Sequence, residues 1–387
     1  MANRETKIII AGAGMGGLTA AAGLSSAGFD VTVYEQSSKL GWVGSGLSLM
    51  TNALTALASV GIRPRFEGRA EEFESLYFLT KKGRPIRTIN FGEITRQIGH
   101  PNLAIHRGSL HEALLEQASG CKIELGAAAT GFSVDGDKVT LKLADGRTAT
   151  GDVLIGADGF NSVIRREIAG PENPTDWNYM VWRATPPFRH PKVTKGYVAH
   201  YWGRGQRFGL ADIGNGNVYW WGTKNMSAEK MRSAPGGKKA IQRYYRGWAD
   251  EIQAVIAATP EDSISSLPAQ DRPFLERWGK GPITLVGDAA HPMLTSLGQG
   301  ACIAIEDGAV LTHCLSTIDD PQDALRAYED RRRERARAIV ETSRALSRIE
   351  QYESPIRSVM RDLYFRFVSE RTLTQQNRLV LTFPGVE

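Results

Sequence analysis

The first thirty-five residues constrain the fold of this chain more than any other stretch. Residues 7–11 are apolar and β-branched, residues 12–17 contain the pattern G-x-G-x-x-G, and residues 18–27 are rich in alanine and leucine. A second β-rich run follows and ends on Glu35. This order predicts a strand, a glycine turn, a helix and a second parallel strand, which together form the unit that binds dinucleotides.

Each glycine of the turn is needed for a different physical reason. Gly12 permits a tight turn, Gly14 lets the backbone approach a pyrophosphate, and Gly17 lets the helix pack closely on the strand. The helix N-terminus offers N–H groups and the positive end of its dipole to phosphates. Glu35 lies where a carboxylate would accept a hydrogen bond from a ribose hydroxyl.

Two other interpretations of this stretch compete with dinucleotide binding. One is a glycine-rich turn that binds nothing, and the other is a membrane span, because residues 8–29 carry no charge. The many glycines and the charges just beyond the run argue against a span. The acid about 20 residues after the turn favours the dinucleotide.

Composition narrows the class of protein further. The chain has 387 residues, enough for two or three domains, and its net charge of +5 suggests anionic ligands without indicating nucleic acid. The basic run at 331–335 includes an acid on a predicted helix and is typical of a solvated face. The three cysteines, Cys121, Cys302 and Cys314, form no C-x-x-C pair, so neither a dithiol centre nor a metal site is predicted. Unpaired cysteines and the lack of a signal-peptide pattern predict a cytoplasmic protein.

Two more strands are followed by an acid. Residues 153–157 lead to Asp158, and residues 283–287 lead to Asp288. In open α/β sheets the carboxyl ends of the strands bind ligands, so both acids are candidate site residues. A glycine-rich segment from Gly298 to Cys302 then opens a helix whose dipole could face an electron-rich ring.

The stretches between these units also have predicted structures and roles. The glycines of 41–49 suggest backbone lying against a flat ligand, and Arg107, just before a helix, could hold a phosphate or a carboxylate of the protein itself. Residues 121–150 are expected to form a β-meander. Residues 322–370 are expected to be amphipathic helix, interrupted at Pro355.

The middle of the chain differs from the rest in its amino-acid composition. Residues 177–264 are rich in aromatic side chains and predict an antiparallel sheet, and residues 74–90 predict a hairpin. The recurring aromatic residues are Tyr179, Trp182, Tyr201, Trp202, Phe208, Tyr219, Trp220 and Trp221. Most are expected to fill a core, and a few to line a flat pocket for an aromatic substrate.

Three motifs occur in order along the chain. They are GAGMGG followed by Glu35, then GADGFNSVIR, then GDAAH followed by GQG and Glu306-Asp307. As a set they resemble the single-component FAD-dependent aromatic hydroxylases, the p-hydroxybenzoate hydroxylase family. Within that family, the sequence most resembles the urate hydroxylase, 6-hydroxynicotinate and salicylate monooxygenase branch.

The resemblance implies an α/β fold in which an antiparallel substrate domain is inserted into a Rossmann-like FAD-binding domain. The FAD-binding domain would comprise residues 1–72, 98–176 and 271–320. The substrate domain would comprise 73–97 and 177–270, and a helical region would follow at 321–387.

The resemblance also implies the residues of the site. His291 of GDAAH would hold its loop, and Arg207 and Tyr219 would contact substrate as catalytic residues. Contacts to FAD would come from Gly12, Gly14, Gly16, Gly17, Glu35, Gln36, Ser48, Arg107, Asp158, Asp288, Gly298, Gln299, Gly300, Ala301 and Cys302. Thr295 replaces a common proline, and Ser296 stands where the urate hydroxylase has an acid, which argues against urate as substrate.

The implied reaction is hydroxylation of an aromatic or heteroaromatic small molecule. NADH or NADPH reduces FAD, O₂ is captured as a flavin C4a-hydroperoxide, and one oxygen atom passes to the ring. The protein is expected to be a monomer or homodimer that binds no nucleic acid and has no membrane span.

Other functions remain as alternatives. The Trp-rich middle also suits an epoxidase or a hydroxylase of a polycyclic natural product, and a non-catalytic flavin-binding sensor is a further possibility. A flavin-free dehydrogenase would leave GDAAH without a role, and a halogenase is disfavoured because no W-x-W-x-I-P segment occurs.

Overall fold

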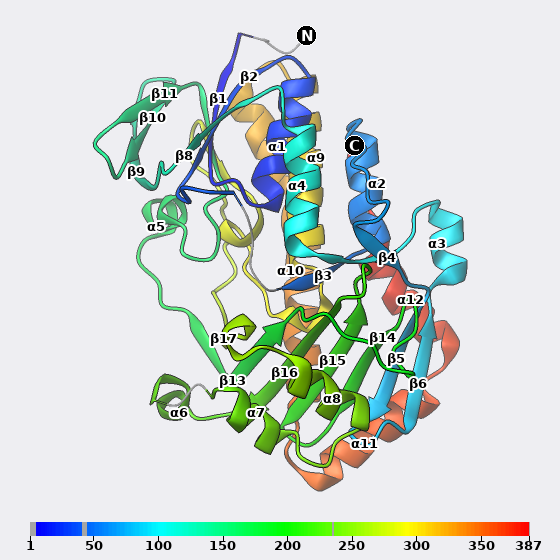
Figure 1. Cartoon of the computed structure of the whole chain (residues 1–387). Coiled ribbons are helices and arrows are strands. Elements are labelled where there is room, and N and C mark those ends of the chain that lie inside the picture. The colour runs from blue at the N-terminus through cyan, green and yellow to red at the C-terminus, as the bar shows by residue number, and fades with distance from the viewer. Residues whose placement is uncertain (1–4, 41–44, 234–235, 387) are drawn as a thin grey trace.

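The computed structural model describes residues 5–40, 45–233 and 236–386. Residues 41–44, part of the glycine-rich run expected to lie against a flat ligand, fall outside this part. The predicted α/β class with a large antiparallel sheet is confirmed (Figure 1). Within the described ranges, no helix is both long and apolar enough to cross a bilayer.

A five-stranded parallel sheet contains the glycine turn. Its strands, in spatial order, are β18 (Ile283–Leu285), β12 (Val153–Gly156), β1 (Lys7–Ala11), β2 (Asp30–Glu35) and β8 (Lys122–Leu125). Strand β8 corrects the expected meander, because Lys122 pairs in parallel with Thr32 of β2. Only β9 (Ala129–Asp135), β10 (Lys138–Leu143) and β11 (Thr148–Gly151) form the meander.

Helices α1 (Met15–Ser26) and α9 (Gly300–Thr317) pack closely beside this sheet (Figure 1). Glycines make the approach possible: a Cβ on Gly308 would lie 2.7 Å from Cβ of Thr19, and one on Gly16 would lie 3.0 Å from the carbonyl oxygen of Ala304. The N-termini of both helices therefore reach the same end of the sheet, where the glycine turn lies.

A seven-stranded sheet forms the other half of the molecule. Its strands, in spatial order, are β17 (Ser265–Asp271), β13 (Thr175–Ala184), β16 (Val218–Asn225), β15 (Gln206–Asp212), β14 (Val198–Trp202), β5 (Ser75–Thr80) and β6 (Pro85–Asn90). Only β14 and β5 pair in parallel. The hairpin near residue 80 thus joins a sheet formed mainly by residues 175–271, while the domain boundaries stay predictions.

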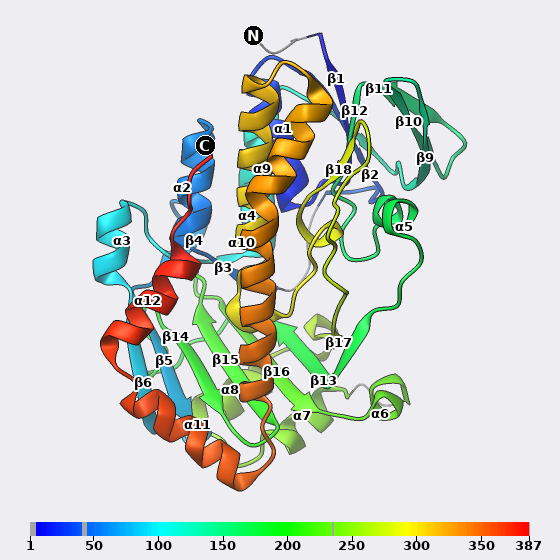
Figure 2. The same cartoon turned by 180° about the vertical axis from the view of Figure 1, so that it is seen from behind.

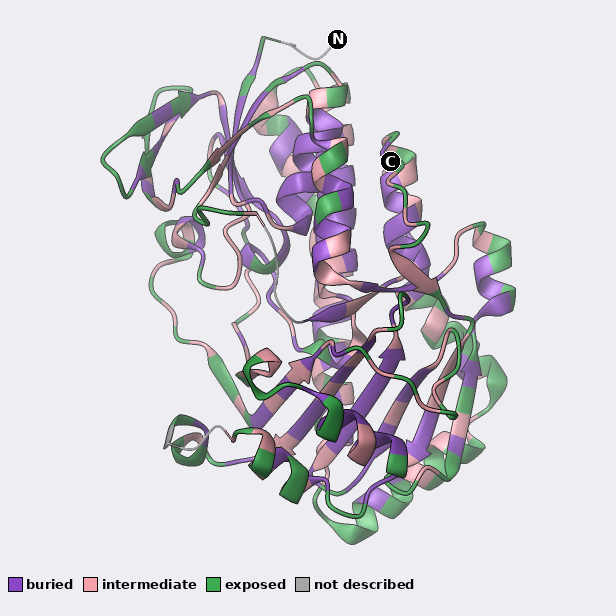
Figure 3. Ribbon diagram, viewed as in Figure 1, coloured by how far each residue is buried: buried purple, intermediate pink, exposed green. Residues whose placement is uncertain are grey.

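Alternation along these strands separates the aromatic residues into two groups. Trp182, Phe208 and Trp220 are fully buried in a core that they share with α7 (Lys238–Tyr244) and α8 (Asp250–Ala258). Tyr219 and Trp221, on either side of Trp220 in the sequence, point to the opposite face. Figure 3 shows how the buried strands of this sheet are covered by partly exposed helices.

The remaining elements connect and cover the two sheets. They are β3 (Gly46–Leu49), α2 (Thr51–Ser59), β4 (Ala70–Glu72), α3 (Gly92–Ile98), β7 (Leu103–His106), α4 (Arg107–Gln117), α5 (Val163–Ala169), α6 (Ala228–Ser233), α10 (Pro321–Glu350), α11 (Pro355–Phe367) and α12 (Glu370–Leu381), with short 3₁₀ turns η1 (Glu261–Ser263), η2 (Gly287–Ala289) and η3 (Thr295–Leu297).

The long helix α10 spans both halves of the molecule (Figure 2). It begins at a cap in which Asp320 accepts a hydrogen bond from the backbone N–H of Asp323, and it ends at Glu350. The predicted interruption at Pro355 marks the start of α11. Helix α10 is therefore the element that can hold the two sheets in register.

A buried cluster of charges fixes α10 to the η2 turn and to α9. Arg332 Nε donates to Asp307 Oδ1 over 2.8 Å, and Arg332 Nη1 donates to Glu306 Oε2 over 2.6 Å. Asp307 Oδ2 lies 2.5 Å from His291 Nε2 and accepts from the N–H of Gly287. His291, just after the η2 turn, thus has its structural partner in α9, in accordance with its expected role.

The pKa values of these acids follow from the cluster. Burial alone would raise the pKa of Asp307, but His291 and Arg332 hold it below its usual range. Burial acts likewise on Glu306, whose pKa is held low by Arg332 and Arg335. Both carboxylates are therefore ionised inside the protein and depend on their cationic neighbours.

We expect Arg332→Met to lower the free energy of unfolding by about 3–5 kcal/mol, because it leaves two buried carboxylates without their shared partner. Urea unfolding followed by fluorescence measures the loss. Arg333→Met is the matched control, because its ion pair with Asp330 lies at the surface. Equal stability of both variants would contradict the importance given to the cluster.

Candidate active site

One large cavity of about 1380 Å³ lies between the carboxyl ends of the parallel strands and the inner face of the seven-stranded sheet. Single drug-sized ligands occupy cavities of roughly 300–1,000 Å³. The volume is therefore large enough for two ligands side by side. Residues from the glycine turn line one end, and aromatic residues of β16 line the other.

The glycine turn is shaped for a group that approaches the backbone. Gly12 has φ of +106°, and a Cβ there would lie 2.4 Å from the carbonyl oxygen of Ala157. A Cβ on Gly17 would lie 2.3 Å from the carbonyl oxygen of Gly12, so this glycine lets α1 pack on the turn. A Cβ on Gly14 would meet only one described atom within 4 Å, at 3.8 Å, and would otherwise fill cavity.

The α1 N-terminus completes this cradle. Gly14 is its N-cap and supplies no side-chain hydrogen bond to the first turn. N–H groups at a helix N-terminus, together with the helix dipole, favour a phosphate. The cradle therefore fits the diphosphate of a dinucleotide.

Glu35 stands beside the cradle at the end of β2. Its Oε2 accepts from the N–H of Ala13 over 2.8 Å, and its Oε1 accepts from the N–H of Ser37 over 2.9 Å. Each carboxylate oxygen can accept a second hydrogen bond, so Glu35 can also hold a ribose hydroxyl. Gln36 lines the same part of the cavity.

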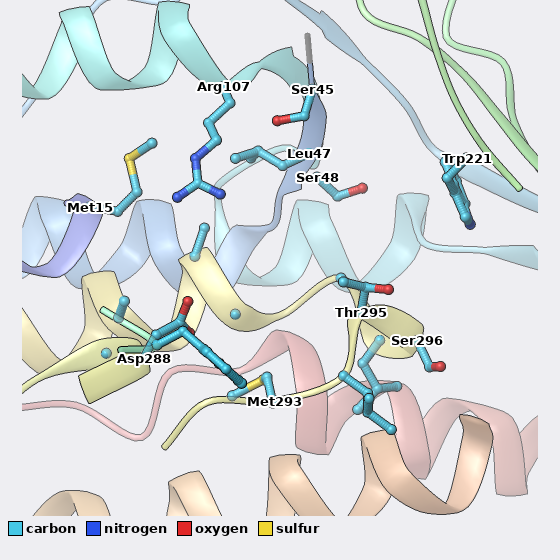
Figure 4. Close-up of a pocket in the computed structure, with 18 of the residues that line it drawn as sticks. Met15, Ser45, Leu47, Ser48, Arg107, Trp221, Asp288, Met293, Thr295 and Ser296 are labelled. Carbon is cyan, nitrogen blue, oxygen red and sulfur yellow. The ribbon is translucent and has the colours of Figure 1, made fainter. Parts of the chain in front are cut away.

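Arg107 and Asp288 face each other across the cavity. In Figure 4 the Arg107 guanidinium points from α4 into the space between Met15 and Asp288. Burial lowers the pKa of Arg107, and Asp288 opposes that shift. The sequence left open whether Arg107 holds a phosphate or a protein carboxylate, and this position suits both.

Asp158 is held by the start of α5 as well as lining the cavity. Its Oδ1 accepts from Ser162 Oγ over 2.5 Å, and its Oδ2 accepts from the N–H of Val163 over 2.8 Å. Burial raises its pKa, while these hydrogen bonds act in the opposite direction. The carboxylate therefore orders the strand–helix turn beside the cradle.

The side chains around the start of α9 point in two directions. Gly298, Gly300 and Ala301 line the cavity, as do Gly16 of α1 and Ser48 of β3. The side chains of Gln299 and Cys302, both expected at the cofactor, turn away from it. The Oε1 atom of Gln299 accepts from Asn52 Nδ2 over 2.9 Å, and burial raises the pKa of the Cys302 thiol to about 12.

These two placements leave the predicted proximity of the segment to the cofactor as a prediction, and they show that the two side chains do not line the cavity. The residues sit at the start of a helix whose outer face is the cavity and whose inner face packs on α2 and β3. Cys302 Sγ donates to the carbonyl oxygen of Ser48 over 3.4 Å. Gln299 and Cys302 can therefore act on a ligand in the cavity only through their backbone atoms or through the packing of these segments.

At the other end of the cavity, Tyr219 and Trp221 form an aromatic wall. Their ring centroids are 5.1 Å apart, and Trp221 meets His200 of β14 edge-on at 5.1 Å. Burial raises the pKa of Tyr219, so its hydroxyl is protonated at neutral pH. Figure 4 places Trp221 together with Thr295 and Ser296 at this end, away from Asp288.

Arg207, the other predicted catalytic residue, does not line the cavity. It is buried behind the cavity wall, and its Nη1 donates to Glu350 Oε2. Glu350, the last residue of α10, does line the cavity. The predicted direct contact between Arg207 and substrate is therefore replaced by an ion pair with Glu350.

Glu350 belongs to a polar cluster that the sequence reasoning missed. Its Oε1, Nδ1 of His200 and Oγ of Ser296 are buried and have no hydrogen-bond partner among the described residues. His200 Nδ1 and Glu350 Oε1 lie 3.7 Å apart, too far for a hydrogen bond. Nothing in the sequence distinguishes Glu350 from the other acids of the C-terminal helices, so only the fold could identify it.

The charge of Glu350 follows from its neighbours. Burial would raise its pKa, but the guanidinium of Arg207 holds it below the usual range. Burial also lowers the pKa of His200. The cluster therefore presents an ionised carboxylate and a largely neutral imidazole to the cavity.

Comparison with known proteins agrees with this architecture. A family model described as FAD binding domain matches residues 5–343. Aurachin C monooxygenase/isomerase of Stigmatella aurantiaca is 32% identical over 376 residues, which are 97% of this chain and 98% of that protein. The 6-hydroxynicotinate 3-monooxygenase of Bordetella bronchiseptica is 30% identical over 361 residues, or 91% and 94% of the two chains.

Among solved structures, Klebsiella pneumoniae HpxO complexed with FAD and uric acid has a TM-score of 0.89 to this chain. The two are 25% identical, and the likeness covers 98% of this chain and 97% of that one. The whole fold, including both sheets and the C-terminal helices, is therefore shared.

We expect Gly14→Ser to lose flavin while the apoprotein stays folded, because serine caps helices well but its side chain would fill the cradle. Flavin absorbance per mole of protein should fall at least about tenfold after dialysis. Gly17→Ala is the comparison, because it crowds α1 against the turn and should cost about 1–3 kcal/mol of stability. Full flavin content in Gly14→Ser would refute the assignment of the cradle.

Proposed function

The chain belongs to the FAD binding domain family and is an FAD-dependent monooxygenase of the aromatic hydroxylase type, and on this premise we propose how its residues divide the work. The glycine cradle, Glu35, Arg107 and Asp288 hold FAD. Tyr219 and the Glu350 cluster hold an aromatic or heteroaromatic substrate.

The observation that carries this proposal is that both groups of residues line one continuous cavity. Bound FAD supplies hydride acceptance from NAD(P)H and the activation of O₂. The chain supplies binding, orientation and exclusion of water, which raise the effective concentration of the reacting groups and suppress side reactions.

At the diphosphate, the donors and charges have complementary tasks. The α1 N-terminus and Arg107 would neutralise the phosphates, and Glu35 and Asp288 would accept hydrogen bonds from hydroxyl groups of the cofactor. Gly298, Gly300 and Ala301 leave room for a flat ring, because a Cβ on Gly300 would meet no described atom nearer than 3.9 Å. The residues present thus fit FAD.

At the substrate end, the orphaned polar atoms define what is bound. Glu350 Oε1 can only accept hydrogen bonds, while Ser296 Oγ can donate or accept. A substrate N–H or O–H group would satisfy the carboxylate, and the ring carrying it would lie along Tyr219 and Trp221. A ring with such a donor would therefore pair with Glu350, whereas a carboxylate placed beside Glu350 would be repelled.

Arg207 is then a positioning residue. Its ion pair keeps Glu350 ionised and fixed at the end of α10. Tyr219 lines the cavity directly and would orient a polar group on the ring through its protonated hydroxyl.

A second candidate is oxygenation of a larger, lipophilic ring system. The cavity extends along the apolar side chains of Phe78, Ile89, Phe91 and Leu373, beyond the aromatic wall. The relative that acts on aurachin C supports this candidate, as do relatives named zeaxanthin epoxidase.

The state of the protein in the cell is proposed from the sequence. The three cysteines are free in the structure, which accords with a reducing cytoplasm. A monomer or homodimer stays the prediction for the assembly.

The first test is steady-state oxidation of NADH and NADPH by FAD-loaded protein, with hydrogen peroxide measured in parallel. Neutral hydroxylated or N–H-bearing heteroaromatic compounds should stimulate oxidation without matching peroxide, and a product with one added oxygen should appear. Stimulation that peroxide fully accounts for would mark an effector. No oxidation with any compound would argue against turnover by the isolated chain.

For the best such compound, we expect Glu350→Gln to weaken binding about tenfold or more, because a hydrogen bond to a charged group contributes about 1.5–3 kcal/mol. Titration of the flavin spectrum measures the dissociation constant, and flavin content should be unchanged. Glu341→Gln, on the exposed side of the same helix, is the control. Unaltered affinity in Glu350→Gln would remove the carboxylate from substrate recognition.

A further inference from the structure

Helix α11 carries an unusual set of exposed apolar side chains. Ten large apolar residues in the described ranges are exposed, and six of them lie on this helix of 13 residues. They are Ile356, Val359, Met360, Leu363, Tyr364 and Phe367. Contiguous apolar surface of this kind marks an interaction site, whereas scattered single residues do not.

The exposed residues share one face of the helix. At 3.6 residues per turn, Ile356, Val359, Met360, Leu363 and Phe367 follow one stripe. The exposed fractions of the two end residues, Ile356 and Phe367, are 73% and 76%. We call these five residues the α11 stripe.

The opposite face of α11 already binds the protein. The Arg361 guanidinium lies 4.7 Å from the ring centroid of Trp202, and the Phe365 ring lies 4.7 Å from the same side chain. Helix α11 is therefore fixed on the seven-stranded sheet at the edge of the molecule (Figure 2), and the exposed stripe lies apart from these contacts. The stripe is additional to the surface that packs this helix.

Positive charge borders the stripe. Arg357 and Arg366 lie at its two edges by helical spacing, and both are exposed. Arg366 Nη2 donates to the carbonyl oxygen of Pro85 over 3.1 Å, which brings the β5–β6 turn with Lys82 and Arg84 beside α11. These two side chains are also exposed.

Two of the acidic residues nearby, Asp362 and Glu370, are already paired with arginines. Asp362 accepts from Arg361 Nε over 2.9 Å, and Glu370 accepts from Arg87 Nη2 over 2.6 Å. The border of the stripe therefore presents cations that can meet anionic groups. An apolar stripe between arginines is the pattern of a helix that lies in the interface of a membrane.

From these observations we propose that α11 docks the protein on an anionic phospholipid surface, with the stripe in the headgroup–acyl boundary. A helix of 13 residues is too short to span a bilayer, so it lies in the plane of the membrane. Because Arg366 and Arg84 gather on one side of it, phosphate groups of anionic lipid would hold its orientation.

The position of the cavity beside α11 suggests what docking on a membrane would serve. Tyr364 and Phe365 of α11 and Leu379 and Val380 of α12 line the cavity, and Tyr364 and Leu379 are at the same time 54% and 49% exposed. The cavity thus borders surface beside the stripe. A lipophilic substrate could pass from the bilayer along apolar side chains to the aromatic wall, with little contact with water.

The test is flotation of the FAD-loaded protein with vesicles of phosphatidylcholine alone or mixed with phosphatidylglycerol. We expect binding to the mixed vesicles that weakens at high salt, and little binding to phosphatidylcholine alone. Met360→Glu with Phe367→Glu should weaken binding about tenfold or more, because burial of a large apolar side chain is lost. Because flotation requires no turnover, its result is separate from that of the oxidation assay.

Two controls keep the test specific. Val134→Glu alters an exposed apolar residue on β10's partner strand β9, far from α11 in Figure 1, and should bind vesicles normally. Light scattering gives the mass of the protein in the absence of lipid. No binding to mixed vesicles, or equal binding by the α11 variant, would overturn the proposal. A dimer that Phe367→Glu converts to monomer, without vesicle binding, would show instead that the stripe joins two copies of the chain.

Discussion

The structure depends on one buried guanidinium, that of Arg332. Arg332 neutralises Asp307 and Glu306 together, and through them it connects α10, α9, the η2 turn and α2. Desolvating three charges is costly, and the cost is offset only when each group keeps its partners in good geometry. Such a cluster favours one arrangement of the helices over others, which suits a site where Asp288 must stand opposite Arg107.

Successive side chains of a β-strand point to opposite faces, and this alternation decides which residues of β16 line the cavity. Trp220 enters the core of the large sheet, whereas Tyr219 and Trp221 reach the cavity. A shift of register by one residue would exchange these roles and would remove the aromatic wall. The core beneath the sheet therefore protects the chemistry of its other face, because the buried indole of Trp220 fixes which neighbours face the substrate.

Local patterns made the cofactor end predictable. The contact between Gly17 and Gly12 spans five positions, and the β1–α1–β2 unit is encoded in one continuous stretch. The aromatic hydroxylase fold followed from three such stretches in order. The substrate end is built differently: Arg207 and Glu350 are 143 positions apart, and no local pattern records that they meet. For Gln299 and Cys302 the motif identifies the segment beside the cavity but not the side of the helix that each side chain takes, so their contact with the cofactor stays a prediction.

Helix α10 also sets a length. At 1.5 Å per residue, the path along α10 from Arg332, which pairs with Asp307 of α9, to Glu350 at the substrate end is about 27 Å. One inserted residue would turn Glu350 by about 100° away from the cavity. The length of this helix therefore sets the distance between the two ends of the cavity, and an insertion within it would separate the position of Glu350 from that of Arg332.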